Sequence, residues 1–478
     1  MCELVSCGVE VIARYLTCLS PRTFAQKSAI FLLTRKRQRA YPYLVRILHI
    51  SDIHIGVESY GHAASEAEVE ALPPYFAPGV DRSQFVGVST RLLDFLTTFD
   101  WSVDYAISHN VDLVLFSGDA YKSRDPSQTH QREFARRIAR LSNVGIPVFL
   151  IVGNHDLPHV ANRATALEIF PTLGVANVTV GATLDTFNVN TNAGPLQIIA
   201  LPWIRIGQFM AKEETRDMTL EQIKNSVEAR LTALLDQEIA QLDPSIPAIL
   251  CAHVTVSGAK LGSERSMMLG NDHVLGLGTM ANPAFDYVAL GHIHKHQVLT
   301  QNPPVVYPGS IERIDFSEER DEKGFMVIDL DHTKPRGDRN VTIEFVRVAA
   351  RKMLTMDVAT NPGEDPTDAA LEVAGKFAGE GLEESIVRMR ITMEAEQEPA
   401  FSEARVRQAL TSAFHLAGID RTVHRERRTR LGTEDAEKIS PMMALRRYLE
   451  SRNTPADREK QLTEYAELLL TEELEGSS

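Results

Sequence analysis

The chain has 478 residues, of which 44% are hydrophobic and 24% charged, a composition typical of a folded globular protein with two or three domains. Its formal net charge of -14 argues against a surface that holds nucleic acid by bulk electrostatics alone, so a nucleic-acid substrate would need a local basic groove, metal ions or a basic partner. The sequence has no run of about 18 apolar residues, and we therefore expect no membrane helix. The four cysteines form neither a disulfide framework nor a CxxC metal site, which suits a reducing cytoplasm.

Residues 1–43 differ from the rest of the chain. They hold three of the four cysteines and a basic cluster from Arg35 to Arg39, and they precede a strand that would make a natural beginning. We expect this extension to be unstructured or a mis-assigned start. A targeting segment is the alternative, which is weakened by Glu3, by Glu10 and by the lack of a clear cleavage signal after an apolar core.

From Leu44 to about Asp331, apolar runs rich in β-branched residues alternate with amphipathic helical stretches, the pattern of a mostly parallel α/β core. The predicted buried strands are Val45 to Ile50, Val111 to Phe116, Val148 to Val152, Ala248 to Ala252 and Tyr287 to Leu290, and the predicted helices are Phe85 to Ser108, His130 to Ser142 and Leu220 to Leu242. Strands continue through Val305 to Tyr307, Gly324 to Leu330 and Val341 to Val348 with less helix between them. A second sheet packed on the first would explain these late strands, so we expect an α/β fold with a two-sheet sandwich flanked by helices.

The pattern changes after the polar stretch Asp331 to Asn340, which predicts an exposed turn or linker. Residues 341–430 form a candidate small α+β module with no candidate metal cluster. Its predicted elements are a strand from Met353 to Val358, a helix from Pro366 to Ala378, a strand from Ile386 to Met393 and a helix from Ser402 to Leu416. We expect a specificity or capping domain rather than a second active site.

Two short amphipathic helices are predicted within residues 438–474. Ser440-Pro441 and Thr454-Pro455 each place an N-cap residue before a proline at the first helical position. The apolar faces consist of Met442, Leu445, Tyr448 and Leu449 on the first helix and of Leu462, Tyr465, Ala466 and Leu469 on the second. These faces either pack on the parent domain or dock on a partner protein, and the pattern alone leaves both open.

Polar clusters follow the predicted buried strands, at the positions where α/β folds place chemistry. In chain order they are Asp52-Ile53-His54, Gly118-Asp119, Gly153-Asn154-His155-Asp156, the isolated His253, and Gly291-His292-Ile293-His294. Because side chains i and i+2 of an extended chain point to the same side, Asp52 with His54 and His292 with His294 could each aim two ligands at one place. Carboxylates with imidazoles suit a divalent metal such as Mn²⁺, Fe²⁺ or Zn²⁺, and the glycines would let the backbone turn tightly.

At these residues the sequence resembles the calcineurin-like metallophosphoesterases, whose motifs it matches in order from Val45 to His294. The segments Tyr307 to Arg313, Asp315-Phe316 and Lys323-Gly324-Phe325 further resemble the SbcD group, the nuclease subunits of a DNA double-strand-break repair complex.

The resemblance implies a site with two divalent metal ions, most simply Mn²⁺. One ion would be held by Asp52, His54 and His294 and the other by Asn154, His253 and His292, with Asp119 bridging the two. His155 would remain free of metal, in contact with the scissile phosphate, and help the leaving oxygen depart. Two such ions about 3.5–4 Å apart can activate water and stabilise charge on the attacking and leaving oxygens. Asp156 is interpreted as a loop-fixing residue, and His49 and His296 as structural or solvated.

The resemblance implies a Mn²⁺-dependent DNA exonuclease and endonuclease that hydrolyses phosphodiester bonds at DNA ends, hairpins and single strands in recombination and break repair. It also implies a homodimer within a heterotetramer, with an SbcC-type coiled-coil ATPase as partner and a cytoplasmic, nucleoid-associated location. Residues 44–335 would form the nuclease domain, residues 341–430 the capping domain and residues 438–474 the partner-binding segment. Where some relatives follow the Gly-Asp with a hydrophobic residue and a histidine that assists exonuclease action, this chain has Ala120-Tyr121-Lys122, so the balance of the two activities stays open.

A small-molecule phosphodiesterase or a protein phosphatase with the same two-metal core is the alternative function. The loop after Asp119 lacks the Val-Asp-Arg-Gly continuation expected of the phosphatases. A small-molecule enzyme would not require the additional C-terminal architecture. A non-catalytic scaffold is a third reading, and the retention of every expected ligand type argues against it.

Overall fold

The structure is a computed structural model. It describes residues 44–158, 163–205, 218–262, 274–377, 381–425, 440–452 and 454–475. The expectation for residues 1–43 lies outside this range. The described residues divide into two compact units, of which the first takes those within Met1–Thr355, Glu383–Val387 and Ala413–Ala417, and the second those within Met356–Leu382, Arg388–Ser412 and Gly418–Ser478.

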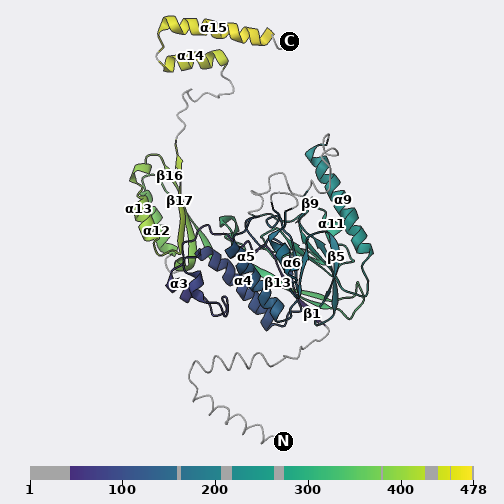
Figure 1. The fold of residues 1–478 in the computed structure, drawn as a ribbon. Coiled ribbons are helices and arrows are strands. Elements are labelled where there is room, and N and C mark those ends of the chain that lie inside the picture. The colour runs from purple at the N-terminus through teal and green to yellow at the C-terminus, as the bar shows by residue number, and fades with distance from the viewer. Residues whose placement is uncertain are drawn as a thin grey trace, which may run out of the picture. The chain divides into compact units, whose positions relative to one another are not determined.

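Two six-stranded sheets form the centre of the first unit (Figure 1). The first sheet has the order β14-β13-β1-β2-β3-β4, with β1 (Leu44–Ile50), β2 (Leu113–Phe116), β3 (Val148–Ile151), β4 (Val178–Gly181), β13 (Gly324–Asp331) and β14 (Val341–Arg347). The second has the order β11-β12-β10-β7-β6-β5, with β5 (Asp185–Asn190), β6 (Pro195–Leu201), β7 (Ala248–His253), β10 (Tyr287–Gly291), β11 (Gln297–Gln301) and β12 (Pro304–Tyr307). A two-stranded sheet pairs β8 (Thr255–Val256) with β9 (Val274–Leu275).

The strand directions explain the mixed sequence pattern. Strands β1 to β4 run parallel in the first sheet, as do β6, β7, β10 and β12 in the second. Strands β13, β14, β5 and β11 pair antiparallel. The expected two-sheet sandwich is confirmed. The expectation that all late strands belong to the second sheet is wrong, because β13 and β14 extend the first sheet beside β1.

The central strands β2, β3, β7 and β10 are buried on both faces, which accounts for their nearly continuous apolar sequences. Val45 and Ile47 of β1 pack between the two sheets, together with residues such as Ile249 of β7. The alternate residues Leu48 and Ile50 pack on the outer face of the first sheet, in the core that the helices complete. Because successive side chains of a strand point to opposite faces of the sheet, the same strand contributes to the core between the sheets and to the core under the helices.

Helices cover the outer face of each sheet and complete the sandwich. Those whose apolar residues join the outer core of the first sheet are α3 (Glu66–Glu70), α4 (Thr90–Ser108), α5 (Gln128–Asn143) and α6 (Ile169–Leu173). Those that cover the second sheet are α9 (Leu220–Ala240) and α11 (Leu277–Met280). The predicted helix from Phe85 starts too early, because a 3₁₀ turn at Arg82–Phe85 and the left-handed Gly87 (φ 81°) precede it.

A three-stranded sheet of order β15-β16-β17 follows, formed by β15 (Lys352–Ala359), β16 (Ser385–Glu394) and β17 (His415–His424), with the helices α12 (Pro366–Phe377) and α13 (Glu403–Ala409). The predicted helix from Ser402 to Leu416 is wrong in its second half. The Thr411 hydroxyl donates to the carbonyl oxygens of Arg407 and Gln408 at the helix end. The residues beyond then pair with β16 as β17, so strand pairing overrides the helical pattern.

Both predicted C-terminal helices are present, as α14 (Pro441–Ser451) and α15 (Ala456–Glu475), and they contact each other. The Ser440 side chain accepts the N–H of Met443, as expected of an N-cap residue before a proline. Leu449 is buried, whereas Tyr448, Leu462 and Tyr465 are exposed. Among the described helices, none is both long enough and apolar enough to cross a membrane.

Candidate metal centre

The predicted site residues all lie at the carboxyl ends of central strands in the two sheets. From the first sheet come Asp52 and His54 after β1, Asp119 after β2, and Asn154 and His155 after β3; from the second come His253 at the end of β7, and His292 and His294 after β10. Except for Asn154 and His155, these residues are buried. The fold therefore brings together side chains that lie far apart in the sequence.

The backbone at the site is left-handed rather than extended. The φ angles of Asp52, His54 and Asp119 are 52°, 48° and 59°, and that of His292 is 101°. Such non-glycine conformations cost about 1–3 kcal/mol each and persist where the surroundings enforce them. Here the N–H of Asp52 donates to the carbonyl oxygen of Gly118 at 3.0 Å, and the N–H of His54 donates to the backbone carbonyl oxygen of Asp119 at 3.2 Å. The extended-chain argument for Asp52 and His54 is therefore wrong, although their side chains do converge.

Two glycines let the loops approach each other closely. A Cβ atom on Gly153 would overlap the Asp119 carboxylate, and one on Gly291 would overlap the carbonyl oxygen of Ser117. Both glycines have ordinary φ values, so their role is close approach and not the tight turn that we predicted. Gly118, with φ 97°, does make such a turn.

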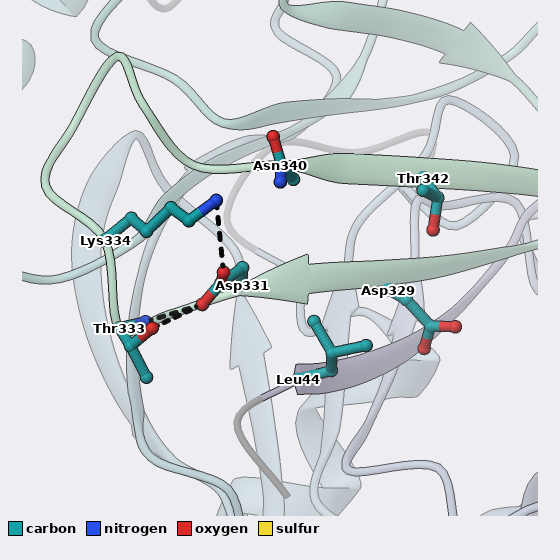
Figure 2. A pocket seen from close by; sticks show the side chains of 7 residues that line it. All are labelled: Leu44, Asp329, Asp331, Thr333, Lys334, Asn340 and Thr342. Atoms are coloured by element: carbon teal, nitrogen blue, oxygen red, sulfur yellow. Dashed lines mark hydrogen bonds and ion pairs between the residues drawn. The ribbon is translucent and has the colours of Figure 1, made fainter. Parts of the chain in front are cut away.

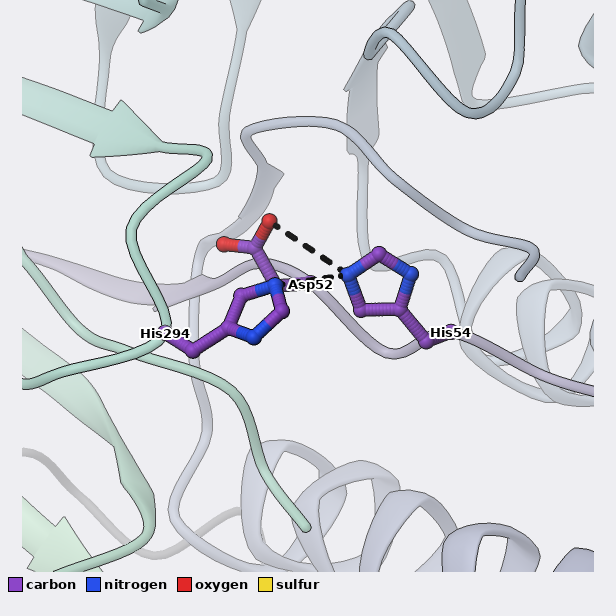
Figure 3. A group of neighbouring side chains, drawn as sticks. All are labelled: Asp52, His54 and His294. Atoms are coloured by element: carbon purple, nitrogen blue, oxygen red, sulfur yellow. Dashed lines mark hydrogen bonds and ion pairs between the residues drawn. The ribbon is translucent and has the colours of Figure 1, made fainter. Parts of the chain in front are cut away.

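The first group of donors consists of Asp52, His54 and His294, whose ligand atoms lie within 4.8 Å of one another. Figure 3 shows the carboxylate and the two rings turned towards each other. The Nε2 atoms of His54 and His294 are 2.9 Å apart, and Nε2 of His54 lies 3.8 Å from Oδ2 of Asp119. Since Nδ1 of His294 lies 2.8 Å from Oε1 of Glu318, we assign the ring hydrogen to Nδ1, which leaves a lone pair on Nε2.

The second group consists of Asp119, His253 and His292, with Asn154 between the two histidines. Oδ1 of Asn154 lies 3.0 Å from Nε2 of His253 and 3.0 Å from Nδ1 of His292. Nδ1 of His253 lies 2.7 Å from the Ser117 carbonyl oxygen, which can only accept a hydrogen bond. An amide oxygen, a carboxylate oxygen and an imidazole nitrogen therefore face one another, an arrangement that a cation would satisfy.

The charges of the buried groups fit this interpretation. Burial opposes charge on His253, but the neighbouring Asp119 outweighs it and raises the pKa of His253 to about 9. Although burial opposes its charge, contacts with His253 and His155 hold the pKa of Asp119 well below its ordinary value. Burial and the His294 ring lower the pKa of His54, so that this ring is neutral at pH 7. In metal-free protein a proton on His253 stands in for a cation, and a divalent ion would displace it.

His155 lies beside Asp119 and His54, and these three side chains form a further group whose possible ligand atoms lie within 4.8 Å of one another. Its N–H donates to Oδ1 of Asp119 at 2.8 Å, and its Nδ1 lies 2.8 Å from the carbonyl oxygen of Lys122. With the ring hydrogen on Nδ1, the opposite edge of the ring presents Nε2. Burial lowers the pKa of His155, so the ring is neutral at pH 7.

Asp156 fixes the loops that carry the donors, as predicted. Its Oδ2 accepts the N–H groups of Gly153 and Asp119, both at 2.9 Å, and its Oδ1 accepts the N–H of Ala120 at 3.0 Å. One carboxylate thus ties the loop after β3 to the loop after β2. Its direct partners are backbone groups, which distinguishes it from the candidate ligands.

Two further histidines, interpreted from the sequence as structural or solvated, have partners within the fold. The buried His49 lies 2.8 Å from the Ser117 hydroxyl and 2.9 Å from the Tyr287 hydroxyl, which links the two sheets behind the site. His296 lies 2.9 Å from the carbonyl oxygen of Tyr307 and stacks on a phenylalanine ring. Both rings have partners within the fold.

The sequence analysis assigned no role at the site to three residues that lie next to it. The ring centroids of Trp203 and His292 are 4.9 Å apart. Glu318 and Lys323 form a buried ion pair behind His294. A signal existed for two of them: Trp203 closely follows the apolar run of β6, and Lys323 is a charged residue directly before that of β13. Nothing in the local sequence distinguishes Glu318 from the neighbouring Glu319.

A separate pocket lies at the start of β1 and along β13 and β14 (Figure 2). It is lined by Leu44, Asp329, Asp331, Thr333, Lys334, Asn340 and Thr342. Its carboxylates have partners already, since Asp329 pairs with Arg46 at 2.7 Å and Asp331 accepts the Thr333 hydroxyl at 2.6 Å. None of the predicted site residues lines it.

The sequence profile of the calcineurin-like phosphoesterases matches residues 45–296, the stretch that carries all of these donor residues. The chain belongs to this family. The expected superfamily and its fold are thereby confirmed, and family and donor geometry together support the use of divalent metal. The identity of the metal and the assignment of each ligand remain predictions.

The chain is also similar to a nuclease subunit, a DNA repair protein and an uncharacterised metallophosphoesterase. It is 27% identical to the D subunit of the nuclease SbcCD of Rhodobacter capsulatus, over 60% of this chain and 66% of that protein. It is 23% identical to "DNA double-strand break repair protein Mre11" of Archaeoglobus fulgidus, over 71% and 67%. It is 26% identical to "Uncharacterized metallophosphoesterase YhaO" of Bacillus subtilis, over 59% and 56%. The resemblance to the SbcD group is confirmed, and the alignments span about two thirds of these relatives or less.

Proposed function

We propose that the chain is a Mn²⁺-dependent DNA nuclease subunit that hydrolyses phosphodiester bonds at DNA ends, hairpins and single strands in recombination and break repair. The observation that carries the proposal is the convergence of two donor groups around Asp119, from the strand ends of two sheets. DNA as the substrate is supported by the names of two similar proteins and by the SbcD-like segments from Tyr307 to Phe325.

Each site residue has a role in this proposal. One ion would be held by Asp52, His54 and His294 and the other by Asn154, His253 and His292, with Asp119 shared between them. When bound, the ions would supply the Lewis acidity that activates water and offsets charge on the phosphodiester. His155 would contact the scissile phosphate through Nε2; its ring, neutral in the free chain, would take up a proton there when the anionic substrate binds and pass that proton to the leaving oxygen. The neutral amide of Asn154 would complete the donor set without adding negative charge opposite the substrate.

We further propose that the two C-terminal helices bind an SbcC-type coiled-coil ATPase, in a heterotetramer built on a homodimer of this chain. Tyr448, Leu462 and Tyr465 support docking, because they are 49%, 39% and 69% exposed. With a net charge of -14, the chain would gain from a partner that contributes to DNA binding.

The same proposal assigns a function to each region of the chain. Residues 44–335 would be the nuclease domain, residues 341–430 the capping domain and residues 438–474 the partner-binding segment.

Digestion of end-labelled duplex, hairpin and single-stranded DNA with Mn²⁺, with and without the ATPase, tests this function. We expect cleavage of all three substrates and stimulation by the partner. His155→Ala serves as the catalytically impaired control. Deletion of the residues after 430 should abolish the stimulation but leave the hydrolysis of bis(p-nitrophenyl) phosphate intact. Hydrolysis of that small diester without DNA cleavage would favour the alternative, a small-molecule phosphodiesterase.

A further inference from the structure

A buried cluster of polar side chains lies behind His294, on the ring edge opposite Nε2. Glu318, in the 3₁₀ turn Phe316–Glu318, places Oε1 2.8 Å from Nδ1 of His294. Its other oxygen, Oε2, lies 2.7 Å from Nζ of Lys323, and both of these side chains are 0% exposed. Oε2 also accepts the N–H of Ile314 at 3.1 Å. The carboxylate thus spans the space between a candidate ligand and a buried ammonium group.

The ammonium group of Lys323 is fully hydrogen-bonded at this position. Its three N–H bonds have three acceptors: Oε2 of Glu318 at 2.7 Å, the Ser310 hydroxyl at 2.8 Å and the carbonyl oxygen of His294 at 3.1 Å. The same carbonyl oxygen accepts the N–H of Ser310 at 3.1 Å. Lys323 therefore holds His294 at two points, directly through its backbone and indirectly, by way of Glu318, through its ring.

The charges in this cluster balance. A carboxylate that accepts from the distal nitrogen of a metal-bound histidine fixes the tautomer and orientation of the ring. Glu318 alone would also add a negative charge behind a centre that receives a phosphodiester. Lys323 cancels that charge at 2.7 Å. The pair can therefore orient His294 without adding net charge.

Stability alone does not account for the pair. The desolvation of two buried charges costs about as much as their attraction returns, and replacing such a pair by neutral side chains of similar volume is often neutral or stabilising. Removing one partner is costly, because the other charge stays buried without compensation. A role at His294 explains why a fully buried pair occupies this position.

We propose that Glu318 and Lys323 are a positioning pair that holds the His294 imidazole with its hydrogen on Nδ1 and its Nε2 lone pair aimed at the ion shared with Asp52 and His54. This inference rests on the proposed two-metal function. It also gives a physical role to Ser310 and Lys323, two residues of the segments that resemble the SbcD group.

Metal binding by full-length variants tests the pair, with Mn²⁺ as the probe in calorimetric titration and in electron paramagnetic resonance. Glu318→Gln removes the carboxylate, and the double variant Glu318→Gln/Lys323→Met also removes the ammonium group that would otherwise stay uncompensated. Glu319→Gln is the matched control, because Glu319 bonds Thr355 instead of His294. All three proteins are compared with the wild type.

We expect the wild type and Glu319→Gln to bind two ions and to show the spectrum of a coupled pair. In both Glu318 variants one of the two ions should bind about 10–100-fold more weakly, and the spectrum of an isolated ion should appear at intermediate Mn²⁺ concentration. The double variant should unfold at the same urea concentration as the wild type, or a higher one.

Two results would overturn the positioning role alone: a double variant that binds both ions with wild-type affinity, or one that fails to fold, since the pair would then serve the fold itself. A wild-type chain that binds fewer than two ions would instead refute the proposed function, and this inference with it.

Discussion

Replacing Asp156 by asparagine should loosen the two loops that carry the donors, although Asp156 is not assigned to a metal. The carboxylate accepts two N–H groups at Oδ2 and two at Oδ1, from Ala120 at 3.0 Å and from Tyr121 at the longer distance of 3.4 Å. In Asp156→Asn the amide oxygen can retain the two bonds from Gly153 and Asp119, but the NH₂ group then faces the N–H of Ala120. The substitution therefore turns an acceptor into a donor at one buried position.

The size of the effect follows from these contacts. A buried N–H left without an acceptor costs about 1–3 kcal/mol. Burial raises the pKa of Asp156 to about 7, so at a pH above this value, where the group is ionised, the two retained bonds also lose charge assistance, at about 1 kcal/mol each. The free energy of unfolding of the first unit should therefore fall by about 3–5 kcal/mol. Mn²⁺ binding should weaken as well, because the backbone of Asp119 is no longer held.

Urea denaturation in the presence of a chelator measures this effect without the contribution of bound metal. Asp125→Asn is the matched control: its carboxylate is exposed in the loop after β2, one of the two loops that Asp156 joins, and a change of less than about 0.5 kcal/mol is expected. If Asp156→Asn unfolded within about 0.5 kcal/mol of the wild type, the account of loop fixing by this carboxylate would be refuted.

Three further predictions concern the chemistry of the site. His155→Ala should retain both ions in a Mn²⁺ titration while DNA hydrolysis falls about 10²–10⁴-fold, as for the loss of a proton-transferring group; unchanged hydrolysis would remove His155 from the mechanism. Asn154→Asp should bind Mn²⁺ more tightly but have a higher KM for DNA, because the added negative charge repels the phosphodiester. A KM equal to that of the wild type in steady-state kinetics would contradict this electrostatic argument. In metal-free protein the pKa of His253 is raised from 6.5 to about 9. Its protonation therefore stabilises the fold fully below pH 6.5, and this contribution is lost as the pH rises through 9. Thermal unfolding in the presence of a chelator should show that the free energy of unfolding falls by up to about 3 kcal/mol over this range, and His253→Gln should not show this fall.

The sequence predicted the donor set well because each donor directly follows an apolar run that can only be a buried strand. Asp119 after β2 and His292 after β10 are examples. Parallel strands end at a common edge, so the convergence of such residues needs no knowledge of loop geometry. The pattern did not contain the order of the strands. The position of β13 beside β1 depends on long-range pairing, and an apolar run does not indicate which other strand it pairs with.

The details of the site required the three-dimensional structure. The left-handed backbone of Asp52 and His54 is imposed by hydrogen bonds to the loop after β2, about 65 residues away. Glu318 owes its role to the 3₁₀ turn that buries it while Glu319 turns to Thr355. The strand β17 was missed because its helix-like spacing of apolar residues gave way to pairing with β16. In each case a distant partner decides between local alternatives.

The donors are divided between two sheets, since Asp52, Asp119 and Asn154 belong to the first and His253, His292 and His294 to the second. An ion bound by donors from both sheets would therefore link the two sheets of the sandwich. Each ion present at one hundred times its dissociation constant would add about 2.7 kcal/mol to the stability of the folded chain. In a cell starved of that metal, the protein would lose its activity and its protection from proteolysis together, and its abundance would follow the metal supply.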